Sequence, residues 1–209
     1  MTGMTTAWAA WTQFHAGHGF AIEHFLNPPA TQADLAAIET ETGYRLPDDL
    51  RALWCRADGQ PDSYRIASPA PGTVISPVFG SYDFMTCAAA LAAYRNWAEI
   101  LEEQGDTMND GITRREGDPV QAAYWIPGWL PFAVDGGGNF YAVDMAPTEG
   151  GTYGQVILMG PDEDERRVLG TRIAAWLSET ARRAPPLNDE AEPPLAHFDM
   201  EHRTPRSTV

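Results

Sequence analysis

The stretch IETETGYRLPDDLRAL, residues 38–53, holds the end of one helix and the start of the next. Thr31 is a favourable N-cap upstream of it and Gly43 a favourable stop, which predicts a helix of about three turns between them. Pro47 then stands at a first-turn position, and Asp48 and Asp49 suit the positive end of a helix dipole. A second short helix is therefore expected to end near residues 58–59.

Three further helices are predicted from the spacing of apolar residues. The first covers Thr6–Leu26 and is weakened in its middle by two glycines. The second covers Thr86–Gln104, and the last begins after Thr171 as N-cap and ends near Arg183. The expected inward face of the second of these helices consists of Cys87, Leu91, Tyr94, Ala98 and Leu101.

The part of the chain richest in strand-forming residues lies between residues 129 and 169. Glycine-rich and acidic turns separate its apolar runs, which predicts an antiparallel meander. Its expected strands are Trp129–Val134, Phe140–Asp144, Gln155–Met159 and Arg166–Leu169. Upstream, the stretch Gln60–Gly80 is expected to form loops with short strands at Arg65–Ala67 and Thr73–Ser76.

These two blocks carry a resemblance to a known family. Residues 38–53, followed by Asp58 and Gly59, resemble the opening signature of the SUKH superfamily, and residues 129–144, 155–157 and 175–177 are similar to its strand block and closing helix. The chain departs from the pattern at two positions. Asn139 stands where Asp commonly follows the glycines, and Asp58 stands where Asn is usual.

The resemblance implies a fold and a domain organisation. It implies a single α+β domain in which helices flank a twisted, mainly antiparallel sheet, with no catalytic centre and no cofactor. We expect an N-terminal helical extension at residues 1–28, the SUKH-like domain at residues 29–183, and a Pro-rich acidic tail at residues 184–209.

The family includes two functional classes. Members comprise fungal Smi/Knr cell-wall assembly regulators and bacterial immunity proteins that bind and neutralise polymorphic toxins. An alanine-rich chain whose basic residues are all arginine suggests a high-GC bacterium. The leading expectation is therefore a non-enzymatic immunity protein that binds a basic cognate toxin; the alternative is a regulatory protein-interaction scaffold of the cell-wall kind.

Charge and the absence of lysine narrow the possible functions. The 209 residues include 29 acidic side chains and 14 arginines, a net charge of −15, with no lysine. A P-loop lysine, a Schiff base and a Ser-Lys dyad are excluded. Acidic surfaces repel nucleic acids, so a basic protein partner is favoured. The tail contributes only −3, which leaves −12 on residues 1–183.

The location expected from the sequence is the cytoplasm. The N-terminus has no apolar run of the signal-peptide kind and no basic residue before Arg45, and no stretch is long and apolar enough to span a membrane. Cys55 and Cys87 each lie among helix-forming residues, where a buried thiol in a reducing compartment is the ordinary interpretation.

Six residues are candidates for protein binding, each with a structural alternative. The acidic turn of Asp162, Glu163, Asp164 and Glu165 could dock on a basic partner, or be a solvated hairpin tip. Asp135 belongs to a glycine-rich turn, and Trp129 could anchor an interface or fill the core.

Other chemistry is less favoured by the sequence. His15, His18 and His24 lack accompanying ligands, so no metal site is assigned. Glu99, Glu102 and Glu103 are expected on an exposed helix face rather than in a hydrolase site, and Asp144 is expected to hydrogen-bond a turn amide.

Overall fold

A computed structural model describes residues 3–63, 76–183, 198–199 and 204–205 of the chain. Of the two short strands expected in the loop region, Arg65–Ala67 lies outside the described residues, and so does all of Thr73–Ser76 except Ser76, which belongs to no strand.

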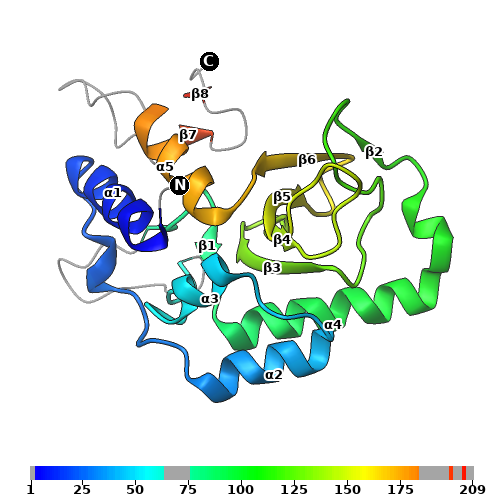
Figure 1. The fold of residues 1–209 in the computed structure, drawn as a ribbon, viewed down its shortest axis with the longest axis horizontal. Helices are drawn as coiled ribbons and strands as arrows, with labels where there is room; N and C mark the ends of the chain where they lie inside the picture. Colours follow the sequence, from blue (N-terminus) through cyan, green and yellow to red (C-terminus); the bar gives the residue numbers. More distant parts are fainter. Residues whose placement is uncertain (1–2, 64–75, 184–197, 200–203, 206–209) are drawn as a thin grey trace.

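The centre of the fold is a six-stranded sheet with the order β1-β3-β4-β5-β6-β2 (Figure 1). All neighbours are antiparallel except β2 and β6, which run parallel. The strands are β1 Asp83–Phe84, β2 Thr113–Arg114, β3 Trp129–Val134, β4 Phe140–Asp144, β5 Gln155–Met159 and β6 Glu165–Gly170, and a separate pair is formed by β7 Phe198–Asp199 and β8 Thr204–Pro205. The predicted α+β class and antiparallel meander are confirmed.

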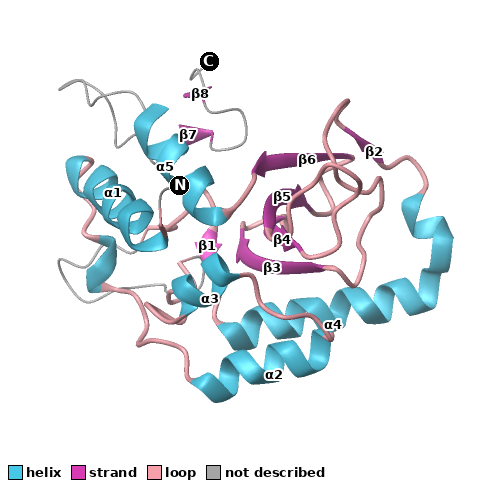
Figure 2. Cartoon of the chain, viewed as in Figure 1, coloured by secondary structure: helices cyan, strands magenta, loops and turns pink. Residues whose placement is uncertain are grey.

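Helices lie on either side of this sheet (Figures 1 and 2). They are α1 Met4–Gly17, η1 Ile22–His24, α2 Gln32–Thr42, α3 Asp48–Trp54, α4 Cys87–Gln104, η2 Gly105–Asn109 and α5 Ile173–Arg183. Helix α4 runs along β3 with α2 packed on it, whereas α1 packs against α5. Within the described residues, no helix is both long and apolar enough to cross a membrane.

Local sequence signals account for the helix boundaries. Thr31 and Asp34 form a reciprocal capping box at the start of α2, and Gly43 ends this helix with φ +71°. The predicted N-terminal helix stops at Gly17, so it is broken where the glycines weaken it. Gly59 has φ +71°, and a Cβ there would lie 2.5 Å from the backbone nitrogen of Thr86, which explains a glycine at this position.

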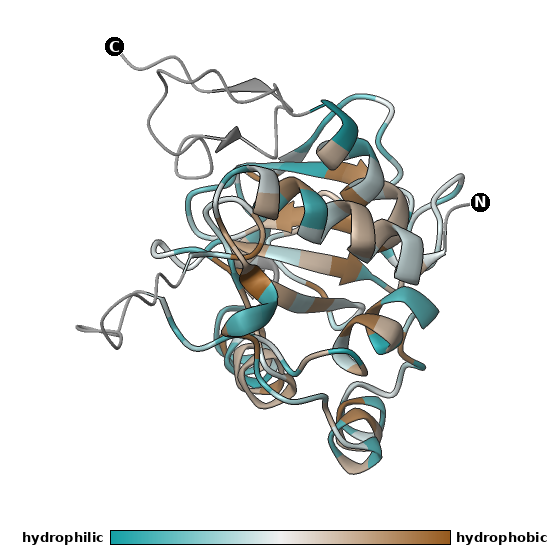
Figure 3. Cartoon of the chain, turned by 90° about the vertical axis from the view of Figure 1, so that its left-hand side faces the viewer, coloured by the Kyte–Doolittle hydropathy of each residue, from teal (hydrophilic) through white to brown (hydrophobic). Residues whose placement is uncertain are grey.

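The core is rich in aromatic side chains, and all seven tryptophans are buried. The ring of Phe79 lies 5.7 Å from that of Phe132 and 5.8 Å from that of Trp176, so it joins the sheet to α5. Hydrophobic residues concentrate on the strands and on the inner sides of the helices in Figure 3.

The inward face of α4 agrees with the predicted one in part. Its buried residues are Cys87, Ala90, Tyr94 and Trp97, whereas the predicted Leu91, Ala98 and Leu101 are partly buried and pack against the core. The helix is turned so that the Trp97 ring contacts the rings of Tyr124 at 5.2 Å and Phe140 at 6.3 Å. The prediction did not include Ala90 and Trp97, which are also buried on this side of the helix.

His15 on α1 is fully buried among aromatic rings. Its ring centroid lies 4.8 Å from that of Trp11 and 5.5 Å from that of Phe14. Burial lowers the pKa of His15 from 6.5 to about 4, because the apolar surroundings disfavour the charged ring. The folded protein therefore keeps this histidine neutral.

Replacing His15 by phenylalanine should make folding less sensitive to acid. Between pH 6.5 and about 4 the unfolded chain binds a proton on His15 and the folded chain does not. The free energy of unfolding therefore decreases as the pH is lowered through this window. The full difference is about 3 kcal/mol. Urea unfolding at about pH 7 and about pH 4.5 measures it, with exposed His24→Gln as the control. An unchanged pH dependence in His15→Phe would refute this assignment.

Candidate functional site

The stretch of residues 38–53 is held in place by the carboxylate of Asp49. Its oxygens accept hydrogen bonds from Arg172 Nε at 2.8 Å, Arg172 Nη2 at 2.5 Å and the backbone amide of Ala174 at 2.9 Å. The Asp49 side chain is 8% exposed. The amide cap in the first turn of α5 thus comes from α3, and not from the expected Thr171, because α5 begins only at Ile173.

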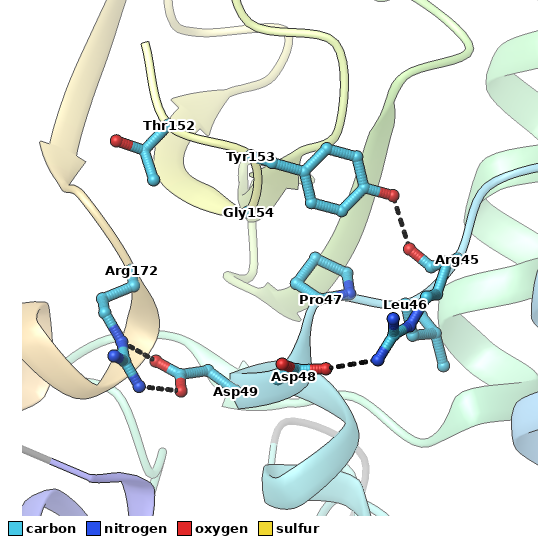
Figure 4. A pocket seen from close by; sticks show the side chains of 9 residues that line it. All are labelled: Arg45, Leu46, Pro47, Asp48, Asp49, Thr152, Tyr153, Gly154 and Arg172. Carbon is cyan, nitrogen blue, oxygen red and sulfur yellow. Dashed lines mark hydrogen bonds and ion pairs between the residues drawn. The ribbon is translucent and has the colours of Figure 1, made fainter.

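A groove of about 380 Å³ lies over this contact and is called the signature groove (Figure 4). Its lining residues are Arg45, Leu46, Pro47, Asp48, Asp49, Thr152, Tyr153, Gly154 and Arg172. The Tyr153 hydroxyl donates to the carbonyl of Arg45 at 2.5 Å, which ties the β4–β5 connection to the α2–α3 connection. Gly154 has φ +80°, and a Cβ there would lie 2.7 Å from that of Pro47. The walls of the groove are therefore closely fitted.

The charges that line the signature groove are paired with one another. Arg172 binds Asp49, and Arg45 Nη2 lies 2.9 Å from Asp48 Oδ1 in a pair whose side chains are 76% and 84% exposed. Tyr153 is 46% exposed, and among the described residues it is the only large hydrophobic side chain that is exposed. The groove thus offers an aromatic surface but no excess charge.

A second groove, of about 500 Å³, lies where β1 meets the start of α4 and the β3–β4 turn, and is called the acidic groove. Its lining residues are Gln60, Asp62, Asp83, Phe84, Met85, Thr86, Ala89, Val134, Asp135 and Gly136. Three of them are carboxylates, and none of these described lining residues is an arginine or a histidine.

Hydrogen bonds fix the inner wall of the acidic groove. Gln60 Oε1 accepts from the amides of Val78 and Phe84 at 2.9 Å, and Gln60 Nε2 donates to Asp83 Oδ1 at 2.9 Å. Ser63 donates to Asp83 through both its amide and its hydroxyl, each at 2.7 Å. Burial raises the pKa of Asp83 and the nearby charge of Asp62 adds to the rise, whereas the Ser63 hydrogen bonds oppose it.

Two of the predicted binding residues are brought together by Asn139. Its Nδ2 donates to Asp135 Oδ2 at 2.9 Å and to Asp162 Oδ2 at 3.1 Å, and its Oδ1 accepts from the amide of Asp162 at 3.0 Å. An aspartate at this position could not donate these bonds and would add a third carboxylate. The structure thus explains the departure from the family pattern, and it joins the acidic turn to the edge of the acidic groove.

The other acidic-turn residues lie at a solvent-facing tip. Glu163 pairs with Arg167 at 2.9 Å and Glu165 with Arg115 at 3.7 Å, while Asp164 is exposed. Below them Arg166 is fully buried and donates to the carbonyls of Ala123, Tyr124 and Glu163. Desolvation lowers its pKa to about 10. The local geometry of the acidic turn is that of a hairpin tip, which was the structural alternative to a docking surface.

Trp129 does not form part of the surface. Its side chain is 0% exposed at the start of β3, and its carbonyl accepts from Trp125 Nε1 at 3.2 Å. Trp129 was expected either to anchor an interface or to fill the core, and the structure places it in the core. A ring without exposed area cannot contact a partner unless the domain unfolds.

The residues considered for catalysis do not form an assembled site. Glu99, Glu102 and Glu103 are exposed on α4. Asp144 is fully buried and accepts from the amide of Ala146 at 2.9 Å, as predicted, and burial raises its pKa. Among the described residues, no group of three or more His, Cys, Asp or Glu side chains is placed to hold a metal ion.

Sequence reasoning missed the acidic groove and the exposed Tyr153. Gln60 and Asp62 come from an irregular region and Asp83 from the two-residue strand β1, and none of them belongs to a periodic pattern or motif. The only signal was the excess of acidic over basic residues, which does not say where carboxylates converge. Tyr153 lies in a turn between two strands, where no periodic spacing of apolar residues marks an aromatic residue as exposed or buried.

The chain is similar in sequence to a known protein family and to several curated proteins. The model of the SMI1 / KNR4 family (SUKH-1) matches residues 29–179. The "Cell wall biosynthesis/cell cycle regulator smi1" of Schizosaccharomyces pombe is 30% identical over 158 residues, covering 73% of this chain and 30% of that protein. The "Cell wall assembly regulator SMI1" of Saccharomyces cerevisiae is 24% identical over 199 residues, covering 82% and 38%.

A third relative has a related name. The "Glucan synthesis regulatory protein" of Neurospora crassa is 27% identical over 187 residues, covering 75% of this chain and 34% of that protein. The matched regions therefore span about a third of the length of these curated relatives.

These relatives correct the leading functional expectation. They are fungal proteins named as regulators of cell-wall assembly or glucan synthesis. The expectation of a bacterial immunity protein with a cognate toxin is therefore wrong, and the regulatory alternative is better supported. The division at residues 28 and 183 into extension, domain and tail stays a prediction.

Two neighbouring carboxylates allow a matched test of the signature groove. Asp49→Asn should lower the free energy of unfolding by about 3 kcal/mol, because it removes one partner of a largely buried ion pair and weakens the cap of α5. Asp48→Asn should cost less than about 1 kcal/mol, because the Arg45–Asp48 pair is exposed. Chemical denaturation measures both; equal losses would contradict the assignment.

Proposed function

Because the chain belongs to the SMI1 / KNR4 family (SUKH-1), we propose that it is a non-enzymatic regulatory protein of the cell-wall assembly kind that acts by binding other proteins. The observation that carries the proposal is the family match over residues 29–179, a range that contains both grooves. The names of the fungal relatives supply the regulatory role. The matched regions cover about a third of each relative, so the regulatory role of a whole relative is only proposed for this chain.

The surface of the domain supports binding rather than catalysis. The signature groove has an exposed aromatic ring between internally paired charges, and the acidic groove has fixed carboxylates over an apolar floor. Aromatic anchors and fixed charges are the usual elements of protein recognition. The net charge of −15 favours basic partners, because opposite charge speeds encounter and selects among partners.

We also propose the cytoplasm as the site of action. Cys55 and Cys87 are both free thiols, and Cys87 is buried. A reducing compartment keeps such thiols unpaired.

Replacement of the matching region of a fungal relative tests the regulatory role. The 209-residue chain would be inserted in place of the matched part of the S. cerevisiae cell wall assembly regulator, in a strain lacking the native protein. We expect growth in the presence of a cell-wall-binding dye to approach that of the strain with the native relative. A relative without its matched region is the negative control.

Two variants sharpen this experiment. Asp48→Asn should retain growth, whereas Asp49→Asn should reduce it in parallel with its loss of folded protein. A chimera that accumulates in folded form to the level of the native relative and yet grows no better than the negative control would refute the proposed function.

A further inference from the structure

We propose that the surface covered by α1 is a docking site for an amphipathic helix of a partner protein, and that α1 is a resident helix which such a partner replaces. The helix that fits carries large aromatic residues at positions i and i+3 and an apolar residue at position i+7. The inference rests on the proposed function, since it names the partner chemistry of a protein-binding domain. It is carried by the packing of α1, by its place outside the family match and by a buried polar side chain that it contributes.

The surface under α1 accepts the face of an aromatic helix. Trp8 and Trp11 of α1 are 1% and 0% exposed. The ring centroid of Trp11 lies 6.3 Å from that of Phe79, and the guanidinium of Arg56 lies 5.9 Å from the ring centroid of Trp8. Helix α1 packs along α5 and also contacts α3 (Figure 1). The covered surface therefore offers an aromatic contact and, beside it, a cation that suits a second aromatic ring.

The family match begins after α1. It covers residues 29–179, whereas α1 covers Met4–Gly17. Between them the chain has Gly19 at φ +82° and the short helix η1. Trp8 Nε1 donates to Glu23 Oε1 of η1 at 3.2 Å, a bond that stays within the N-terminal segment. A terminal element that meets the rest of the domain by packing is the kind that an equivalent element can replace.

Helix α1 has few local features that stabilise it. Its N-cap residue Gly3 makes no side-chain cap, and its first turn holds no acidic residue, in contrast to the capping box of α2. It has 14 residues, a length at which an isolated helix is marginal in water. The helical form of α1 therefore depends on its packing against the domain.

One residue of α1 makes this packing less favourable than its aromatic rings suggest. His15 is 0% exposed, and among the described residues neither of its ring nitrogens has a partner in normal hydrogen-bond geometry. A buried polar atom without a partner lowers stability, because it loses its water without replacement. A helix with leucine in place of His15 avoids this loss and keeps the contacts of Trp8 and Trp11. The resident helix is thus a weaker ligand than an apolar helix of the same pattern.

The covalent connection of α1 sets how strongly a partner must bind. Because α1 is attached to the domain, it competes with the high effective concentration of a tethered ligand. A free helix of the same sequence therefore displaces α1 poorly. Displacement is favoured by a gain at the position of His15 in the partner or by a loss of helix stability in α1, and the two effects can be tested separately.

The probes are three blocked, fluorescently labelled peptides that cover residues 3–18. The first has the native sequence, the second carries His15→Leu, and the third carries His15→Leu together with Trp8→Ser and Trp11→Ser. Fluorescence anisotropy with the full chain measures affinity, and amide chemical shifts of the isotope-labelled protein locate the site. We expect the His15→Leu peptide to bind about tenfold more tightly than the native peptide, with shifts on α5 and around Phe79, and the serine peptide not to bind.

Two exposed alanines provide matched variants of the full chain. Ala9→Gly lowers the helix propensity of α1 without changing its buried face, and Ala92→Gly makes the same change on α4. Ala9→Gly should tighten binding of the His15→Leu peptide by about fivefold, because the resident helix competes less well. Ala92→Gly should change this affinity by less than about twofold. Thermal unfolding checks that each variant is folded.

Each other outcome overturns the inference. Equal binding of the serine peptide would show that the tryptophans are not recognised, and equal binding of the native and His15→Leu peptides would show that His15 does not weaken the resident helix. Equal effects of the two glycine variants, or shifts away from α5, would show that the peptide does not replace α1. No binding of any peptide at millimolar concentration would make α1 a fixed part of the core.

Two further measurements separate this inference from its alternatives. Dimers in which two chains exchange α1, detected by size-exclusion chromatography, would make a second copy of the chain the occupant and overturn the assignment to a partner protein. A chimera that restores growth although no peptide binds keeps the regulatory role and removes the docking site. Peptide binding with a failed chimera refutes the regulatory role alone.

Discussion

The contact of Asp49 with Arg172 and the amide of Ala174 connects the start of the domain to its end. Asp49 lies in the first turn of α3, and its carboxylate faces the first turn of α5, so one negative charge serves the positive ends of two helices. Helix α5 then carries Trp176, whose ring lies 4.9 Å from that of Tyr141 and 6.0 Å from that of Phe132. Helix α1 packs on α5 in turn, so the N-terminal helix is connected to this contact through α5.

Elements whose cause is local could be predicted from the sequence. The ends of α2 follow from Thr31 and Gly43, and the strands β3, β4 and β5 follow from apolar runs between turn residues. The role of Asp49 could not be predicted, because a carboxylate after Leu-Pro already has a local explanation at the start of α3. Its second partner lies more than a hundred residues away and appears only when the chain folds.

The same distinction applies to the residues predicted for protein binding and to those that line the acidic groove. The acidic turn was visible as a run of four acids, and the structure shows that Asp162 reaches Asp135 through Asn139. Gln60 and Asp83 were invisible, because they converge through hydrogen bonds between a loop and a short strand. A charge run can be read along the chain, whereas the lining of a groove depends on which residues the fold brings together.

This arrangement explains why recognition of the family did not decide between its functional classes. The residues that carried the resemblance, from Leu46 to Asp49 and around Gly59, are engaged in capping, close packing and internal ion pairs. Residues so engaged specify the fold and have little freedom to specify a partner. Asp62 and Asp83 lie outside the quoted stretches and line the acidic groove. A match to the signature therefore identifies the fold and does not decide between the functional classes of the family.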